Sequence, residues 1–180
     1  MTYQEILQNE EVRAFLKKGN ENLGTLGYTD HSEKHCAIVA QNAAMLLEAL
    51  GFSEHERELV KIAGFMHDIG NAINRSHHAE YGALLANDIL KDKDMPLEDR
   101  ITVVTAIANH DESTGGEVDA ISAALILADK TDVRRNRVRN MDRASFDIHD
   151  RVNYAVTEPS LKVDLEKQVI VLDLKVDETI

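Results

Sequence analysis

The sequence predicts an all-α domain that ends in a small C-terminal β-hairpin. Apolar residues recur at helical spacing along most of the first 132 residues, and caps and glycine stops divide this region into segments of helical length. After Pro159 the period changes. In residues 160–176, SLKVDLEKQVIVLDLKV, apolar and polar residues alternate around a turn near Glu166–Lys167, which is typical of paired strands.

The first two helices are predicted from their periodicity and their ends. One covers residues 3–18 and ends near Gly19, and a loop rich in glycine and asparagine follows it. The next runs from residue 33 to residue 50, with Ser32 as its N-cap and Gly51 as its stop.

The third helix opens with a capping box, because Ser53 is followed three residues later by Glu56, and it ends at Gly70. Apolar periodicity predicts the remaining helices over residues 78–91, from Pro96 to about His110, over 118–132 and, as a short one, over 148–156.

The composition favours a globular protein over a nucleic-acid binder. The chain has 180 residues, enough for one domain with a sizeable core, and acidic residues outnumber basic ones 32 to 20. A formal charge of −12 and 4% aromatic residues leave little positive surface and few stacking platforms for nucleic acid. The single cysteine, Cys36, excludes an internal disulfide. Without a signal-like or membrane-spanning run, we expect a cytoplasmic protein with no membrane partner.

Five titratable residues stand at positions where burial is costly. His35 lies in the apolar stripe of the second helix, and His67 and Asp68 end the apolar run of the third. His110 ends the fifth helix, and Asp129 lies on the inward face of the sixth. A buried imidazole or carboxylate needs a partner, and both are suitable donors for divalent cations. The sequence therefore predicts a metal site between the helices.

Several segments in a fixed order carry a resemblance to a known family. His35 lies in DHSEKHCAIVAQNA, the pair His67 and Asp68 lies in GFMHDIGN, and Asp129 lies in ILADKTD. A further segment, HAEYGALLANDIL, places a histidine four residues before a glycine. Together these segments resemble the HD-domain metal-dependent phosphohydrolases over roughly residues 28–135.

The resemblance implies an HD-like helical bundle with the metal held between helices, which we assign to residues 1–158. The alternating pattern after Pro159 adds a hairpin extension over residues 159–180. The hairpin would cover the core or contribute to a homodimer. One divalent ion would be held by four ligands, His35, His67, Asp68 and Asp129. Some members bind a second ion through two more histidines, here His78 and His110, with Asp68 bridging the two ions. The identity of the ion is left open among Mn, Fe, Ni, Co, Zn and Mg, and one or two would bind.

The expected activity is hydrolysis of a phosphate ester or anhydride in a nucleotide or another small phosphorylated molecule. Asp68 and Asp129 would serve catalysis by orienting the attacking water. Phosphate also needs cationic contacts, and guanidinium groups match its oxygens. The residues expected to contact the substrate flank the ligands: Lys130, Arg134 and Arg135 after Asp129, and His31 and Lys34 beside His35.

Other functions stay open at this stage. A non-catalytic regulator would bind a nucleotide in the same fold without turnover. A nucleic-acid module would use the arginine-rich segment, although the acidic balance disfavours it. A few relatives of the wider fold use iron pairs for oxygen chemistry. The sequence contains no GYP triplet, which argues against hydrolysis of cyclic di-GMP.

Overall fold

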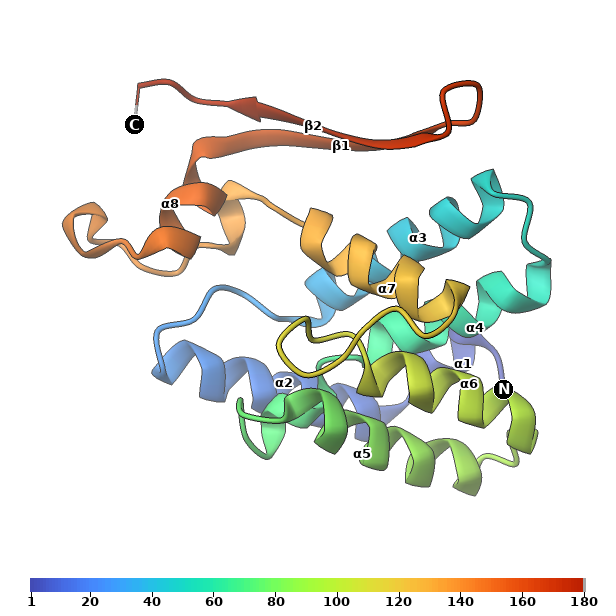
Figure 1. Ribbon diagram of the computed structural model, residues 1–180. Coiled ribbons are helices and arrows are strands. Elements are labelled where there is room, and N and C mark those ends of the chain that lie inside the picture. Colours follow the sequence, from blue (N-terminus) through green and yellow to red (C-terminus); the bar gives the residue numbers. More distant parts are fainter. Residues whose placement is uncertain (180) are drawn as a thin grey trace.

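The all-α prediction and its C-terminal hairpin are confirmed by the computed structural model, which describes residues 1–179 (Figure 1). Eight α-helices and three short 3₁₀ helices occupy these residues up to Ala155, and two antiparallel strands follow. No helix in this part of the chain is long and apolar enough to cross a membrane. The helices are α1 (Tyr3–Leu7), α2 (Glu10–Thr25), α3 (Glu33–Ala49), α4 (Glu54–Met66), η1 (Ile69–Ala72), α5 (His78–Asp92), α6 (Leu97–Ala108), α7 (Ala120–Thr131), η2 (Arg135–Arg137), η3 (Arg143–Ser145) and α8 (Ile148–Ala155).

The predicted first helix is wrong in its extent, because two helices cover that region. The side chain of Asn9 accepts hydrogen bonds from the backbone N–H groups of Glu11 and Val12, so a new helix starts there. That helix, α2, continues through Gly19 instead of ending at it. A Cβ added to Gly19 would lie 3.0 Å from the Cβ of Asn71, so the missing side chain lets α2 pack closely against η1.

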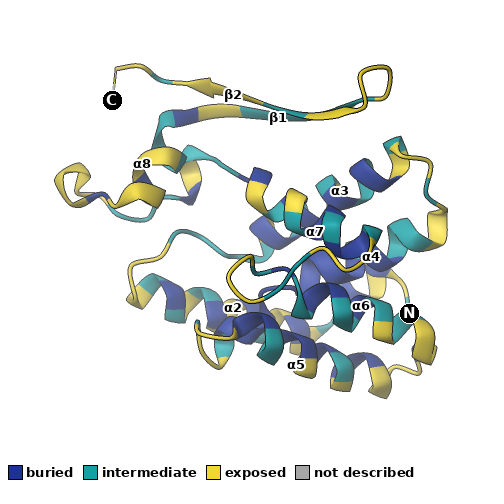
Figure 2. Ribbon diagram, in the orientation of Figure 1, coloured by how far each residue is buried: buried dark blue, intermediate teal, exposed yellow. Residues whose placement is uncertain are grey.

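Helices α3 and α4 form the centre of the domain. The predicted capping box is present, since Ser53 accepts from the N–H of Glu56 and the Glu56 carboxylate accepts from the N–H of Ser53. Gly64 brings the two helices together, because a Cβ there would lie 2.7 Å from the Cα of Ala40. Figure 2 shows the buried residues on the facing sides of the helices, where they form one apolar core. This close packing places the N-terminal half of α3, which contains His35, beside the C-terminal end of α4.

The chain after α7 leaves the helical core. The arginine-rich segment forms the short turns η2 and η3, and α8 leads directly into strand β1 (Val156–Asp164). Strand β2 (Val169–Val176) pairs antiparallel with β1, and residues 165–168 form the turn between them, as predicted. The first strand begins at Val156, so it enters the segment assigned to the helical part; the division at residue 158 stays a prediction.

Candidate metal centre

A break at the end of α4 places His67 and Asp68 in one site. Adjacent residues on a regular helix point about 100° apart. Here the α-helix ends at Met66, Asp68 adopts φ −96° and ψ 1°, and the 3₁₀ helix η1 follows. Gly70 in this turn allows η1 to lie against the start of α5, because a Cβ there would lie 2.0 Å from the carbonyl oxygen of His78. The local backbone thus brings His67 and Asp68, at the end of α4, close to His78 at the start of α5.

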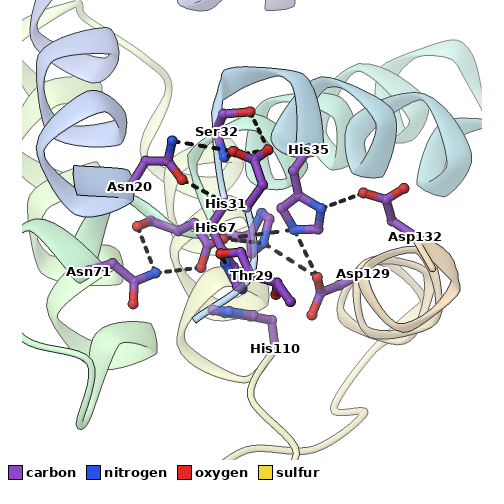
Figure 3. A network of polar contacts seen from close by, with 12 residues as sticks. Asn20, Thr29, His31, Ser32, His35, His67, Asn71, His110, Asp129 and Asp132 are labelled. Carbon is purple, nitrogen blue, oxygen red and sulfur yellow. Dashed lines mark hydrogen bonds and ion pairs between the residues drawn. The ribbon is translucent and has the colours of Figure 1, made fainter. Parts of the chain in front are cut away.

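The first donor set brings together residues that lie almost one hundred positions apart (Figure 3). His35 Nε2 lies 3.1 Å from Asp129 Oδ1 and 3.8 Å from Asp68 Oδ2. His67 Nε2 lies 3.3 Å from Asp68 Oδ2 and 3.7 Å from Asp129 Oδ1. The donor atoms of His35, His67 and Asp129 all lie within 4.8 Å of one another, so one cation can reach them together.

A second donor set shares Asp68 with the first. The donor atoms of Asp68, His78 and His110 also lie within 4.8 Å of one another. His78 Nε2 lies 3.1 Å from His110 Nε2 and 3.8 Å from Asp68 Oδ1. Since Asp68 offers Oδ2 to the first set and Oδ1 to the second, its carboxylate is positioned to bridge two cations.

The imidazoles of both sets are held in the same tautomer. The Nδ1 atoms lie 2.7 Å from Asp132 Oδ2 for His35, 2.8 Å from Gly64 O for His67 and 2.7 Å from Ile107 O for His110. His78 Nδ1 lies 3.1 Å from Arg75 O. A carbonyl or carboxylate oxygen only accepts, so each Nδ1 donates, and in the neutral ring each Nε2 has a lone pair for a cation.

Two residues that the sequence reasoning did not assign hold the ligands in place. Asp132 accepts from His35 and is 2% exposed, and Asn71 donates to Asp68 Oδ1 at 2.6 Å. Asp132 lies three residues after Asp129, one helical turn further along. The spacing of one turn could have suggested that Asp132 lies on the same side of the helix as Asp129, but it does not reveal the contact with His35.

The residues present fit a divalent cation. His35 Nε2 and Asp68 Oδ2 are buried and, within residues 1–179, have no hydrogen-bond partner. Such atoms are costly to bury, and a bound cation satisfies both. A third group of donor atoms joins His67 and Asp68 to Cys36. Burial, with Asp68 nearby, raises the pKa of that thiol well above its ordinary value, which disfavours a thiolate ligand.

Electrostatics distinguish the two donor sets. Burial opposes a charge on His67, but the Asp68 and Asp129 carboxylates outweigh it and raise its pKa to about 9. Burial would also raise the pKa of Asp68, yet the nearby imidazoles hold it well below its ordinary value. In the second set burial prevails, lowering the pKa of His78 and bringing that of His110 to about 4. Without a cation, a proton therefore occupies the first set and the second stays neutral.

A cavity of about 330 Å³ adjoins the donor sets, and four of their residues line it: Asp68, His78, His110 and Asp129. Its walls carry seven carboxylates and three cationic side chains, a formal excess of four negative charges. The carboxylates are Asp68, Asp111, Glu112, Asp129, Asp132, Asp147 and Asp150, and the cations are Arg75, Lys130 and Arg137.

Only two of the five residues predicted to contact the substrate line this cavity. His31 and Lys130 do, and so does Arg75, which the sequence reasoning missed. Lys34 lies exposed on α3 away from the cavity. Arg134 is bound to Asp132.

Arg135 also lies outside the cavity. Its guanidinium contacts the carbonyl oxygen of Tyr154 at 2.6 Å and the carboxylate of Asp177 at 2.8 Å. These partners tie the segment after α7 to the last turn of α8 and to the residue that follows β2. The structure therefore does not bring Lys34, Arg134 or Arg135 to the donor sets.

Comparisons with known proteins agree with the fold. A model of the HD domain matches residues 33–148. An uncharacterized protein of Methanocaldococcus jannaschii is 29% identical over 192 residues, covering 94% of this chain and 74% of its own length. The crystal structure of a predicted HD superfamily hydrolase from an uncultured Thermotogales bacterium has the same fold, with a TM-score of 0.53 and 20% identity over 74% of this chain and 75% of its own. Because the HD domain model matches more than half of its length and the helical fold agrees, the chain belongs to the HD domain family.

Proposed function

We propose that this protein is a metal-dependent phosphohydrolase that cleaves a phosphate ester or anhydride of a small molecule such as a nucleotide. The observation that carries the proposal is the Asp68 carboxylate, which lies beside both donor sets, with Oδ2 near His35 and His67 and Oδ1 near His78, and lines the cavity. A pair of cations held by a bridging carboxylate is a recurrent arrangement for hydrolysis of phosphate esters. The similarity to a predicted hydrolase of the HD superfamily supports the same reaction class.

The charge of the cavity supports dependence on metal. A wall with four excess negative charges repels a phosphate group, so the protein alone is a poor receptor for it. Two divalent cations would cancel this negative excess, polarise a phosphoryl oxygen and make water more acidic. Arg75 and Lys130 are the cationic groups placed to contact the remaining phosphate oxygens. Arg137 is less available, because it donates to the carbonyl oxygens of Asp30 at 3.0 Å and Asp132 at 2.7 Å.

The roles proposed for the two catalytic aspartates follow from their surroundings. Asp68 is 3% exposed and held by Asn71, so it fixes the relative position of the donor sets. Asp129 is more open, with 15% of its side chain exposed, and it lines the cavity. Burial would raise the pKa of Asp129, but the neighbouring imidazoles of His35 and His67 hold it well below its ordinary value. A carboxylate with a low pKa accepts hydrogen bonds without retaining a proton, so Asp129 orients the attacking water.

The test is turnover of defined phosphate esters by protein of known metal content. Chelator-treated protein is reconstituted separately with Mn²⁺, Fe²⁺, Co²⁺, Ni²⁺, Zn²⁺ and Mg²⁺, and then assayed with p-nitrophenyl phosphate and with nucleoside mono-, di- and triphosphates. We expect turnover that requires metal and is lost in Asp68→Asn. Asp88→Asn, an equal change on the exposed side of α5, should retain it. Binding of a nucleotide without any turnover would favour the regulatory alternative.

A further inference from the structure

The C-terminal hairpin packs little against the helical domain. It is attached where β1 starts, at the buried Val156, and by Asp177, whose N–H donates to Ala155 O at 2.8 Å and whose carboxylate accepts from Arg135. Figure 2 shows that most of β2 and the turn are exposed. Two strands alone are at best marginally stable in water, and a third strand or a packed layer is usually needed. The hairpin thus lacks part of its support in a single copy.

One face of the hairpin is entirely apolar over its central pairs. The register places Pro159 opposite Leu174, Leu161 opposite Leu172 and Val163 opposite Ile170, so these six side chains share a face. Part of this face lies over α3, where Leu161 and Leu172 line a cavity of about 180 Å³. Leu174 and Ile170 remain 38% and 40% exposed.

The outer edge of β2 is self-complementary. Within residues 1–179 the sheet contains only β1 and β2, so this edge has no strand beside it, and unpaired edges readily pair with another chain. Suppose that two copies of β2 pair antiparallel about a two-fold axis at Leu174. Asp173 of each copy then lies opposite Lys175 of the other copy, which gives two such pairs. In the same register Leu172 lies opposite the partner's Val176, which extends the apolar face.

The charges already paired inside the hairpin fit the same arrangement. Lys175 lies 3.8 Å from Glu158 across the strands, and Asp173 lies 3.2 Å from Lys162. In the two-fold pairing Asp173 and Lys175 each gain a neighbour of opposite sign from the second copy, while Lys162 and Glu158 on β1 keep them paired within the hairpin. We propose that this protein forms a symmetric dimer in which two hairpins join through β2 into one four-stranded sheet.

Solution mass tests the proposal directly. Light scattering at about 100 μM, where micromolar affinity gives mostly dimer, should give twice the chain mass of 20.1 kDa. Leu174→Lys places two like charges at the axis and should give the monomer mass. Leu165→Lys makes the same change at an exposed residue of the turn, outside the paired strand, and should remain dimeric. A monomeric wild-type protein would overturn the proposal.

Crosslinking separates this dimer from association through another surface. Antiparallel partners lie about 5.5 Å apart between Cα atoms, within the range of a disulfide. Leu174→Cys should therefore form a disulfide-linked dimer under mild oxidation, while Leu165→Cys should not. The natural Cys36 is fully buried and does not compete. If the Leu174→Cys variant is a dimer by mass but does not form the disulfide, the proposed pairing is also overturned.

Discussion

His35 and Asp132 are joined by a hydrogen bond of 2.7 Å between Nδ1 and Oδ2, across 97 positions of the chain. Asp132 is itself held by Arg134, whose Nη2 donates to the same oxygen at 2.9 Å. This contact fixes the ring of His35 so that Nε2 faces Asp129 and Asp68. Orientation of a ligand by a buried partner of this kind is worth a measurable part of metal affinity.

Replacing Asp132 by Asn should weaken metal binding at the first donor set by about 10–100-fold, because the charge that supports His35 is lost. Direct titration by calorimetry measures the affinity. The matched control is Asp99→Asn, since Asp99 makes a similar contact of 2.8 Å with the exposed His55, far from the donor sets. Unchanged affinity in Asp132→Asn would show that the His35 ring needs no such support.

Replacing Gly70 by Ala should destabilise the domain by about 3 kcal/mol, because the added methyl group collides with backbone. A Cβ there would lie 2.0 Å from His78 O and 2.5 Å from Gly82 N, so η1 and α5 must separate. Denaturant unfolding measures the loss. Gly116→Ala is the control, since nothing lies within 4 Å of a Cβ at that position. Equal stability of the two variants would contradict the close packing of η1 on α5.

Metal uptake should release about one proton at the first donor set and almost none at the second. His67 has a pKa raised to about 9, so at pH 7 it is protonated and must lose its proton to bind a cation. His110, with a pKa lowered to about 4, is already neutral. Calorimetry in buffers of different ionisation enthalpy counts the protons.

The direction of the pH dependence follows from the same group. Because the His67 pKa is raised, protons compete with metal at every pH below about 9. Affinity at the first set should fall about tenfold for each pH unit lowered between 8 and 6. His67→Ala should remove the released proton together with most of the affinity. Binding at the first set that is independent of pH in this range would contradict the assignment.

The burial of the donor residues was predictable from the sequence, because helical periodicity places them. His35 sits in an apolar stripe, and the residues before His67 form an apolar run, so burial of both is implied without coordinates. The family order of these residues adds Asp129. That these residues meet at one point depends on contacts between helices, such as the close approach of Gly64 to Ala40, and periodicity does not describe such contacts.

The cationic groups of the cavity were harder to predict because they lie in segments without a period. Arg134 and Arg135 follow Asp129 closely in sequence, yet neither lines the cavity, because Arg134 pairs with Asp132 and Arg135 pairs with Asp177. Arg75 lies in the loop between η1 and α5, and no pattern marks it. Its position follows from the close packing of these two elements, which is a property of the fold.

Arg75→Ala should raise the KM for a phosphate substrate by roughly 10–100-fold, the cost of losing a charge-assisted hydrogen bond of about 1.5–3 kcal/mol. Its guanidinium lines the cavity and lies 3.3 Å from His78 Nε2, with one face over the ring of Tyr28. Steady-state kinetics with saturating metal measure the change. Lys34→Ala removes an exposed cation of α3 outside the cavity and should leave KM unchanged. If Lys34→Ala raises KM and Arg75→Ala does not, the substrate phosphate approaches from the α3 side, as the sequence alone suggested.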